Sequence, residues 1–89
     1  MELPDTVTDD LRTRLRRVEG QVRGIEKMLE EGRDCRELVT QLSAANKALE
    51  QVGFRLVSAG LAYCLTEPEK AEAEGYRLDE VETMFRKLA

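Results

Sequence analysis

The sequence of 89 residues contains no histidine and no tryptophan, and only 4% of its residues are aromatic. Histidine is the usual general base and the most common metal-ligating side chain. Its absence excludes the Ser-His and Cys-His arrangements of nucleophilic catalysis. The sequence also shows no cofactor-binding loop and no cluster of metal ligands. We therefore expect that the protein is not an enzyme.

Long apolar runs are missing as well. The longest stretch without a charged residue is LVSAGLAYCLT, residues 56–66, whereas a membrane-spanning helix needs about 20 apolar residues. The start of the chain is acidic and does not resemble a signal peptide. The hydrophobic fraction of 42% is too high for a disordered chain. We expect one domain, residues 1–89, located in the cytoplasm and without a membrane partner. A chain this short favours oligomerisation.

Acidic residues outnumber basic ones, and the formal net charge is −4 with a pI of about 4.9. This balance argues against a nucleic-acid-binding protein. The distribution is uneven, however, because residues 11–23 carry five arginines and one glutamate, a local net charge of +4. Arginine forms bidentate contacts with phosphate, so this segment is a candidate nucleic-acid surface. From charge alone, a solvated helix face with ion pairs is the simpler interpretation.

A heptad pattern predicts a first helix over residues 9–31. Its apolar residues alternate in steps of four and three, which is the a/d pattern of a coiled-coil seam. They are Leu11, Leu15, Val18, Val22, Ile25 and Leu29. Start signals lie at Thr8, Asp9 and Asp10, and Gly32 is a stop signal.

The same pattern predicts a second helix over residues 35–65, with Asp34 as its start signal. Its seam consists of Cys35, Leu38, Leu42, Ala45, Leu49, Val52, Leu56, Ala59 and Tyr63. A second apolar stripe consists of Phe54, Val57, Leu61 and Cys64. Two apolar faces on one helix indicate contacts with more than one neighbour.

The remaining segment is acidic and ends in a third predicted helix over residues 78–88. Pro68 marks either the end of the second helix or the start of the next element. Gly75 interrupts the segment, and the structure of residues 66–77 stays open. The third helix is amphipathic, with apolar residues Leu78, Val81, Phe85 and Leu88. The predicted fold class is all-α: a three-helix protomer with a long antiparallel helical hairpin.

The two cysteines, Cys35 and Cys64, cannot meet within one chain if the second helix is continuous. They are separated by 29 residues, which is about 43 Å at 1.5 Å per residue. A disulfide requires Cα atoms within about 7 Å. Two copies of the helix packed antiparallel about a two-fold axis near Leu49 and Glu50 bring Cys35 of one chain beside Cys64 of the other, twice per dimer. The alternative is that both cysteines are small buried hydrophobic residues.

Several motifs resemble the CsoR/RcnR family of bacterial transcriptional repressors. They are RTRLRRVEGQVRGIEKMLEEGRDC, VTQLSAANKALEQVG and the spacing of the two cysteines. The resemblance covers residues 11 to about 65 closely and the third helix loosely. It implies an antiparallel homodimer that assembles into a homotetramer, and operator DNA binding through basic residues of the first helix. It also implies an inducer, bound between the long helices of two protomers, that releases the DNA.

One departure from the family pattern concerns the inducer. Copper-sensing members place a histidine four residues before the second cysteine, and this chain has Gly60 there. The remaining cysteine pair, Cys35 and Cys64 of the partner subunit, resembles the persulfide-sensing, CstR-like branch. The resemblance therefore implies a sensor of persulfide or polysulfide donors that requires no cofactor. The alternative is a Cu(I)-responsive repressor that uses the same two thiolates, because soft thiolates select Cu(I).

Four arginines are the predicted DNA-binding residues. Arg14, Arg17 and Arg23 match basic positions of the family, and Arg16 is adjacent to them. We expect these side chains to contact DNA phosphates. A third class of function, a purely structural helical interaction module without DNA binding, stays open as an alternative.

Overall fold

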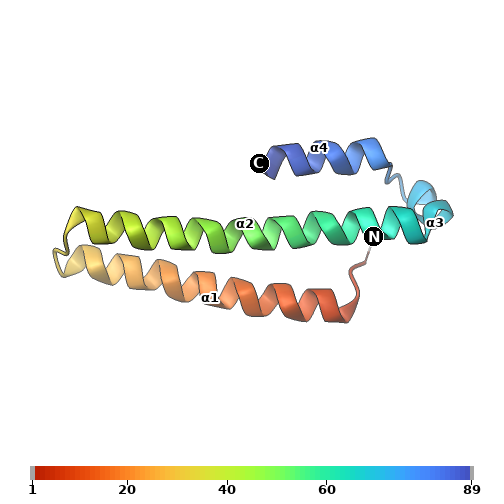
Figure 1. Cartoon of the computed structure of the whole chain (residues 1–89). Helices are drawn as coiled ribbons and strands as arrows, with labels where there is room; N and C mark the ends of the chain where they lie inside the picture. The colour runs from red at the N-terminus through yellow and green to blue at the C-terminus, as the bar shows by residue number, and fades with distance from the viewer. Residues whose placement is uncertain (1, 89) are drawn as a thin grey trace.

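The computed structural model describes residues 2–88, and these residues form four helices and no strand. The helices are α1 (Asp5–Glu30), α2 (Cys35–Thr66), α3 (Pro68–Ala73) and α4 (Leu78–Leu88). The prediction of an all-α protomer with a long antiparallel hairpin is confirmed (Figure 1). The short helix α3 is an addition to the three helices expected from the sequence.

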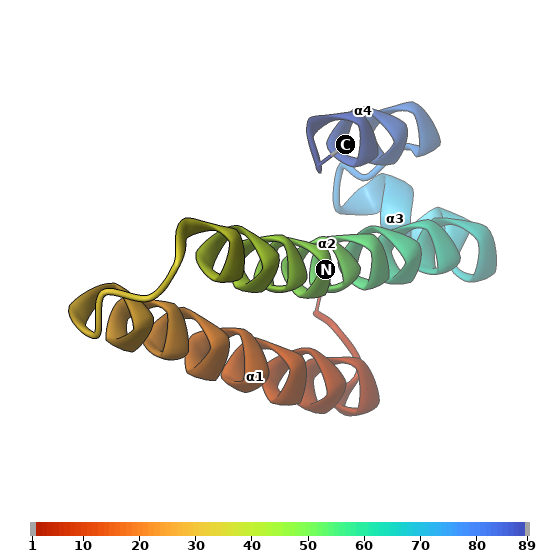
Figure 2. The same ribbon diagram turned by 60° about the vertical axis from the view of Figure 1, so that its left-hand side comes forward.

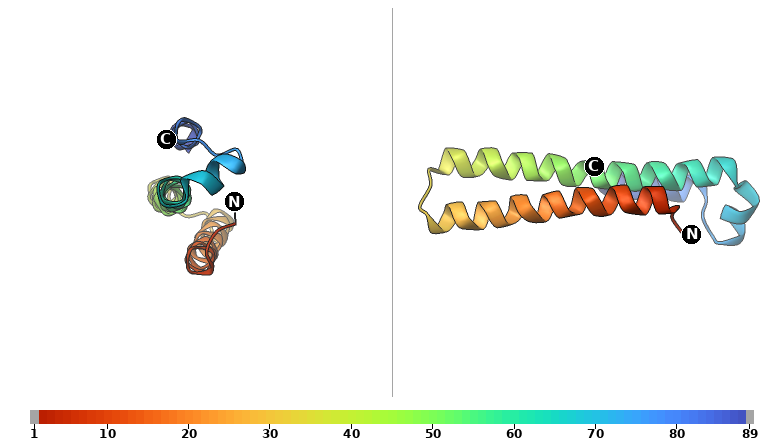
Figure 3. Two further views of the ribbon diagram at one scale, coloured as in Figure 1. Left: turned by 90° about the vertical axis from the view of Figure 1, so that its right-hand side faces the viewer. Right: turned by 90° about the horizontal axis from the view of Figure 1, so that it is seen from below.

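Helix α2 is the central element of the protomer. Helix α1 runs antiparallel to it along one side, and α4 runs back along the other side (Figure 1). The turned view in Figure 2 and the end-on view in Figure 3 show the same order, with α2 between α1 and α4. The molecule measures 55 × 25 × 14 Å. It is therefore a flat layer that is one helix thick over much of its length.

Helix α1 begins at Asp5, four residues before the predicted start. The carbonyl oxygen of Pro4 accepts hydrogen bonds from the amides of Val7 and Thr8, both at 3.0 Å. The fixed φ of proline suits a position at a helix start, and an acidic residue in the first turn interacts favourably with the helix dipole. Asp9 and Asp10, which were expected to start the helix, are thus already inside it.

The α1–α2 turn contains Gly32 as the stop signal that the sequence indicated, one residue beyond the C-cap Glu31. Gly32 has φ +69°, its amide donates to the Leu29 carbonyl, and the Arg33 amide donates to the Met28 carbonyl. This hydrogen-bond pattern is a Schellman motif, which requires a left-handed residue. Asp34 then caps α2 by accepting a hydrogen bond from the Arg36 amide at 3.0 Å.

The α2–α4 connection contains the two chain-breaking residues of the acidic segment. Pro68 is the first residue of α3, where the missing amide of proline costs nothing. Gly75 ends α3 with φ +86°. Helix α3 has six residues and buries only Ala71, so its sequence contains too little apolar periodicity to predict a helix.

The second apolar stripe of α2 packs against α3 and α4, as predicted. Cys64, Ala71 and Val81 form a small buried cluster. Phe54 and Phe85 meet edge to face with ring centroids 6.3 Å apart, which is a favourable aromatic geometry. Val57 and Met84 are partly buried and pack against the cluster of Cys64, Ala71 and Val81.

The protomer leaves much apolar surface uncovered. Its accessible area is 6953 Å², whereas a compact protein of this mass exposes about 5,300 Å². The radius of gyration is 16.9 Å, against about 12 Å for a compact domain of this length. In the described part of the chain, no helix is long and apolar enough to cross a membrane.

Candidate functional site

The two cysteines lie at opposite ends of α2. Cys35 is the first residue of the helix, and Cys64 lies in its last turn. Because α2 is unbroken over its 32 residues, the sequence-based separation of about 43 Å applies. One protomer therefore does not bring the two thiols together.

Cys64 occupies a preformed apolar environment. Its exposed fraction is 7%, and it packs with Ala71 from α3 and Val81 from α4. Tyr63 and Tyr76 lie against the same cluster. Gly60, four residues before Cys64, is also buried. The C-terminal end of α2 is thus covered by the protomer itself.

Cys35 has the opposite environment, because it is exposed beside the α1–α2 turn. Its neighbours are charged. Arg33 donates a hydrogen bond to the Glu37 carboxylate at 2.8 Å, and this contact raises the pKa of the Arg33 guanidinium. Glu37 therefore forms an ion pair across the turn.

Tyr63 forms a polar contact beside the buried thiol of Cys64. Partial burial raises the pKa of the Tyr63 hydroxyl above its ordinary value, and a hydrogen bond to Glu74 raises it further. Glu74 is the residue that follows α3. The contact therefore joins the last turn of α2 to the end of the short helix.

An exposed leucine stripe runs along the middle of α2 between the cysteines. Leu42, Leu49 and Leu56 are 53%, 49% and 43% exposed, and their spacing of seven residues places them on one helix face. Leu49 lies midway between the other two leucines. The midpoint between Cys35 and Cys64 falls between Leu49 and Glu50, so the stripe and the cysteine pair have nearly the same centre.

The predicted DNA-binding arginines fall on two faces of α1. At 3.6 residues per turn, Arg14 and Arg17 flank one side of the apolar seam, and Arg16 and Arg23 flank the other. Arg23 is highly exposed, with its guanidinium 3.7 Å from the Glu19 carboxylate. Arg16 and Arg17 are also exposed. Sequence reasoning treated the four as one basic segment, but they do not form one surface within the protomer.

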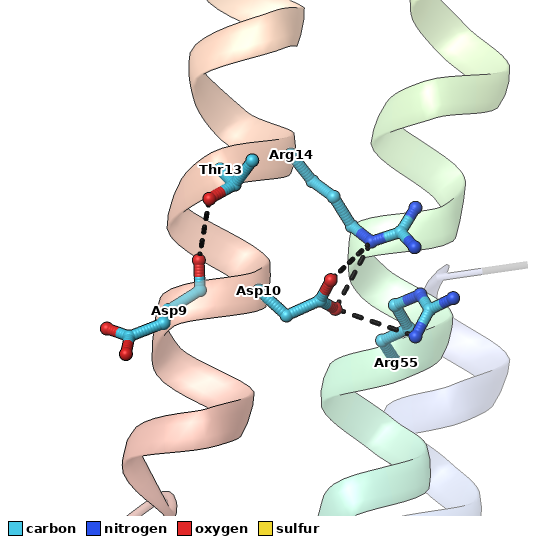
Figure 4. Close-up of polar contacts among 5 residues, drawn as sticks. All are labelled: Asp9, Asp10, Thr13, Arg14 and Arg55. Carbon is cyan, nitrogen blue, oxygen red and sulfur yellow. Dashed lines mark hydrogen bonds and ion pairs between the residues drawn. The ribbon is translucent and has the colours of Figure 1, made fainter.

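Arg14 differs from the other three arginines because it is held in an ion-pair cluster. Its Nε donates to both carboxylate oxygens of Asp10 at 3.2 Å. The guanidinium of Arg55, which comes from α2, lies 3.5 Å from the same carboxylate. Figure 4 shows the two arginines converging on Asp10 from neighbouring helices. The sequence analysis missed Arg55 because the contact depends on the register of α1 against α2.

Metal-ligating side chains are sparse in the protomer. Among residues 2–88, no group of three or more His, Cys, Asp or Glu side chains is placed to hold a metal ion. The thiol-bearing residues Cys35 and Cys64 are too distant from each other within one chain. Two thiolates from two protomers, by contrast, are a donor set that suits the soft ion Cu(I).

Comparisons with known proteins identify the chain at family level. A family model described as "metal-sensitive transcriptional repressor" matches residues 7–87. The chain is 48% identical over 67 residues to the copper-sensing transcriptional repressor RicR of Mycobacterium tuberculosis, covering 75% of this chain and 67% of that protein. It is 33% identical over 80 residues to the copper-sensing transcriptional repressor CsoR of Bacillus subtilis, covering 90% and 79%.

A solved structure has the same fold. The copper-sensing repressor CsoR with Cu(I) from Geobacillus thermodenitrificans NG80-2 aligns with a TM-score of 0.76 and 32% identity, over 98% of this chain and 91% of that chain. Since the relatives are transcriptional repressors, the expectation that the protein is not an enzyme is confirmed. The expectation of no cofactor was wrong, because these relatives sense copper and point to a metal ligand. Persulfide sensing receives no support from them.

Proposed function

Since the chain belongs to the family of metal-sensitive transcriptional repressors, we propose that it binds operator DNA and releases it when Cu(I) bridges two protomers. The ligands of this site are Cys35 of one protomer and Cys64 of the partner subunit. The observation that carries the proposal is the location of the two thiols at opposite ends of one straight helix, on either side of an exposed leucine stripe.

The surface of the protomer supports an antiparallel assembly. A two-fold axis at Leu49 superimposes the leucine stripe on its own copy and aligns each Cys35 with a Cys64, so one axis satisfies both requirements. The protomer exposes roughly 1,650 Å² more than a compact chain of its mass. A standard interface removes about 800 Å² from each partner. The exposed surface is therefore large enough for more than one interface, as a homotetramer made from two homodimers requires.

The donor set supports Cu(I) as the inducer. Two thiolates are sufficient for a two-coordinate site, and thiolate selects Cu(I) over harder ions. The ligands differ in environment, since Cys64 is supported by Ala71 and Val81 whereas Cys35 is exposed. Binding requires deprotonated thiols, so Cu(I) affinity falls as pH decreases.

The exposed arginines of α1 support DNA binding. We assign phosphate contacts to Arg14, Arg16, Arg17 and Arg23, and two-fold symmetry doubles this set in a dimer. Because the four arginines lie on two faces of α1, assembly must bring faces of different protomers to the same side of the DNA. Inducer binding at α2 must then stabilise an arrangement of the protomers that binds DNA weakly. Relative to the arrangement that binds DNA well, this stabilisation must amount to about a few kcal/mol.

A second candidate inducer is a persulfide, and the absence of histidine favours it. The Cys35 thiolate attacks the sulfane sulfur of the donor and becomes a Cys35 persulfide. The rest of the donor leaves as a thiolate. The Cys64 thiolate of the partner subunit then attacks the Cys35 persulfide. A disulfide between the protomers forms and hydrosulfide leaves, so the exchange requires no further oxidant.

The two inducers are distinguished by anaerobic DNA-release measurements. A fluorescent duplex is first selected from a random-sequence pool by the reduced wild-type protein. Its anisotropy is then followed while either Cu(I) or glutathione persulfide is added. We expect Cu(I) to release the duplex at one equivalent per protomer, reversibly on addition of a Cu(I) chelator. Release by the persulfide alone, with a covalent dimer in non-reducing mass spectrometry, identifies the second candidate instead. If neither compound releases the duplex, the proposed inducer site is wrong.

Mixed dimers test whether the site is shared between protomers. Cys35→Ser and Cys64→Ser should each bind DNA normally and lose the response to inducer. A dimer made from one copy of each variant retains one complete site in the antiparallel arrangement, because each protomer supplies the cysteine that the other lacks. We expect the purified mixed dimer to bind half as much Cu(I) per protomer as the wild type, and both parent dimers to bind none. A mixture that binds no Cu(I) contradicts the shared site.

A further inference from the structure

We propose that Arg14 and Arg55 form one joint phosphate-binding site and that Asp10 is the residue that positions them. This inference rests on the proposed DNA binding but does not depend on the identity of the inducer. Arg55 lies on α2 and outside the basic segment of α1. It adds a DNA contact from the same helix that carries both cysteines.

The geometry of the Asp10 contacts carries the proposal. Asp10 accepts two hydrogen bonds from Nε of Arg14, both at 3.2 Å. The two outer amino groups of Arg14 are not used by this contact. They constitute the end of the guanidinium that binds phosphate in a bidentate manner. Asp10 therefore fixes the orientation of Arg14 and leaves its phosphate-binding end available.

Arg55 is oriented in a similar way from the other helix. Its Nη1 atom lies 3.5 Å from Oδ2 of Asp10, and this contact does not use its Nη2 or Nε atom. The view in Figure 4 shows both guanidinium groups on the same side of the Asp10 carboxylate. Two arginines that share one carboxylate keep a net charge of +1, so the cluster attracts an anion.

Exposure distinguishes this cluster from the other ion pairs of α1. The Arg14 side chain is 30% exposed, whereas Arg23, paired with Glu19, is 76% exposed. A fixed arginine loses less rotamer entropy when it binds phosphate than a freely moving one. The Arg14–Arg55 pair is consequently better prepared for a specific contact, and Arg23 is better suited to general attraction of DNA.

The Asp10→Asn variant gives a result whose sign decides the role of Asp10. If Asp10 only weakens the positive surface, its neutralisation raises DNA affinity. If Asp10 positions the arginines, neutralisation lowers affinity although a negative charge has been removed. We expect a loss of about threefold to fivefold at 0.1 M salt, which corresponds to one weakened charge-assisted contact. A gain in affinity overturns the positioning role.

The Arg55→Ala variant tests the joint site itself. A phosphate contact that is lost reduces the slope of log K against log salt by about one for each contacted phosphate. The probe is the duplex selected by the wild-type protein. Its binding constant is measured by anisotropy at salt concentrations from about 0.05 to about 0.2 M. We expect about a tenfold loss of affinity and the reduced slope. Affinity and slope equal to the wild type overturn the assignment of Arg55.

Matched controls separate a loss of DNA contact from a loss of structure. Arg77 and Asp79 form a comparable exposed pair, 3.5 Å apart, at the start of α4. Arg77→Ala and Asp79→Asn remove the same charges as the test variants at a site outside the cluster. The oligomeric state and melting temperature of every variant are measured alongside, because a purely structural defect changes these without reducing the salt slope selectively.

A double variant and the wild type complete the design. In Arg14→Ala/Arg55→Ala, the additional change Asp10→Asn should have no further negative effect on affinity, because both positioned groups are gone. A further loss contradicts the positioning role. If the wild-type protein selects no duplex from the pool, the proposed DNA-binding function fails as a whole. If the wild type binds and Arg55→Ala binds equally well, only the joint site fails.

Discussion

The two ends of α2 carry the same reactive group in opposite environments. Cys64 is buried against α3 and α4, whereas Cys35 is exposed beside the α1–α2 turn. Within one protomer, Cys64 is already packed against neighbouring side chains, whereas Cys35 is exposed to solvent. In the proposed antiparallel dimer, each buried Cys64 would lie beside the exposed Cys35 of the partner subunit. In the proposed arrangement, the unit of function is therefore larger than one chain.

A stripe of leucines lies on α2 between the two ends. Leu42, Leu49 and Leu56 form an exposed apolar face on a helix that also packs against α1 and α4. A helix with one face uncovered remains incomplete as a folding unit. The proposed assembly about Leu49 would both cover this face and align the cysteines, so the same contacts would provide stability and form the site.

The largest effect is expected from a charge placed at the proposed axis. Leu49→Glu sets the carboxylate of each protomer against its own copy, and burial of unpaired like charges costs several kcal/mol. We expect a dissociation constant of the dimer at least about a hundredfold higher than that of the wild type. Sedimentation equilibrium of the reduced protein measures this change. Cu(I) binding should be lost in parallel, because the two ends of α2 no longer meet.

The control for this experiment is a glutamate on another face of the same helix. Ala44 is exposed, and its spacing from Leu42 and Leu49 places it outside the leucine stripe. Since glutamate is a good helix former, Ala44→Glu should assemble normally. If Leu49→Glu and Ala44→Glu show the same sedimentation behaviour, Leu49 does not lie in the dimer interface. The symmetric relation between the two ends of α2 is then wrong.

A smaller effect is expected from serine at each end of α2. Serine at position 64 places a hydroxyl in the apolar cluster with Ala71 and Val81, and an unsatisfied buried hydroxyl costs about 1–3 kcal/mol. Serine at position 35 lies on the surface, where substitutions change stability by about 0.5 kcal/mol or less. Urea denaturation of Cys64→Ser and Cys35→Ser at equal protomer concentration measures the difference. Equal losses would indicate that the assembled protein buries both cysteines to the same extent.

Sequence patterns predicted the long helices well because their apolar residues repeat over many turns. The two stripes of α2 correctly indicated more than one neighbour, and the distance between Cys35 and Cys64 followed from helical rise alone. Helix α3 was missed because six residues with one buried alanine contain no periodic signal. The start of α1 was placed too late because Asp9 and Asp10 resemble cap residues, although Pro4 provides the actual start.

The candidate site was predictable only where one helix determined it. The arginines of α1 were recognised from charge, but their separation onto two faces needs the helical wheel together with the packing direction of the seam. Arg55 could not be found from sequence, because its contact with Asp10 joins residues 45 positions apart in the chain. The expectation of no cofactor was also wrong: the missing histidine led to a preference for persulfide, with Cu(I) kept as the alternative, whereas the relatives are copper-sensing.

The smallest effect concerns the polar contact at the covered end of α2. Burial and the hydrogen bond to Glu74 raise the pKa of the Tyr63 hydroxyl above its unfolded value of 10.0. The folded state therefore favours the neutral hydroxyl, and this stabilisation is fully present below pH 10.0. It is lost as the pH rises through the higher pKa of the folded state. Tyr63→Phe should lower stability slightly below pH 10 and remove this part of the pH dependence.

Urea denaturation of the wild type and Tyr63→Phe on both sides of pH 10 measures this contribution as a difference between two proteins. Groups that both proteins share, such as the lysines, cancel in the difference. Tyr76→Phe is the matched control, because it removes the hydroxyl of the other tyrosine in the same cluster. The difference for Tyr63 should shrink as the pH rises, whereas a constant difference assigns Tyr63 to packing alone. In that case the hydrogen bond to Glu74 does not stabilise the packing of α3 beside Cys64. The difference in environment between Cys64 and Cys35 is then due to apolar contacts only.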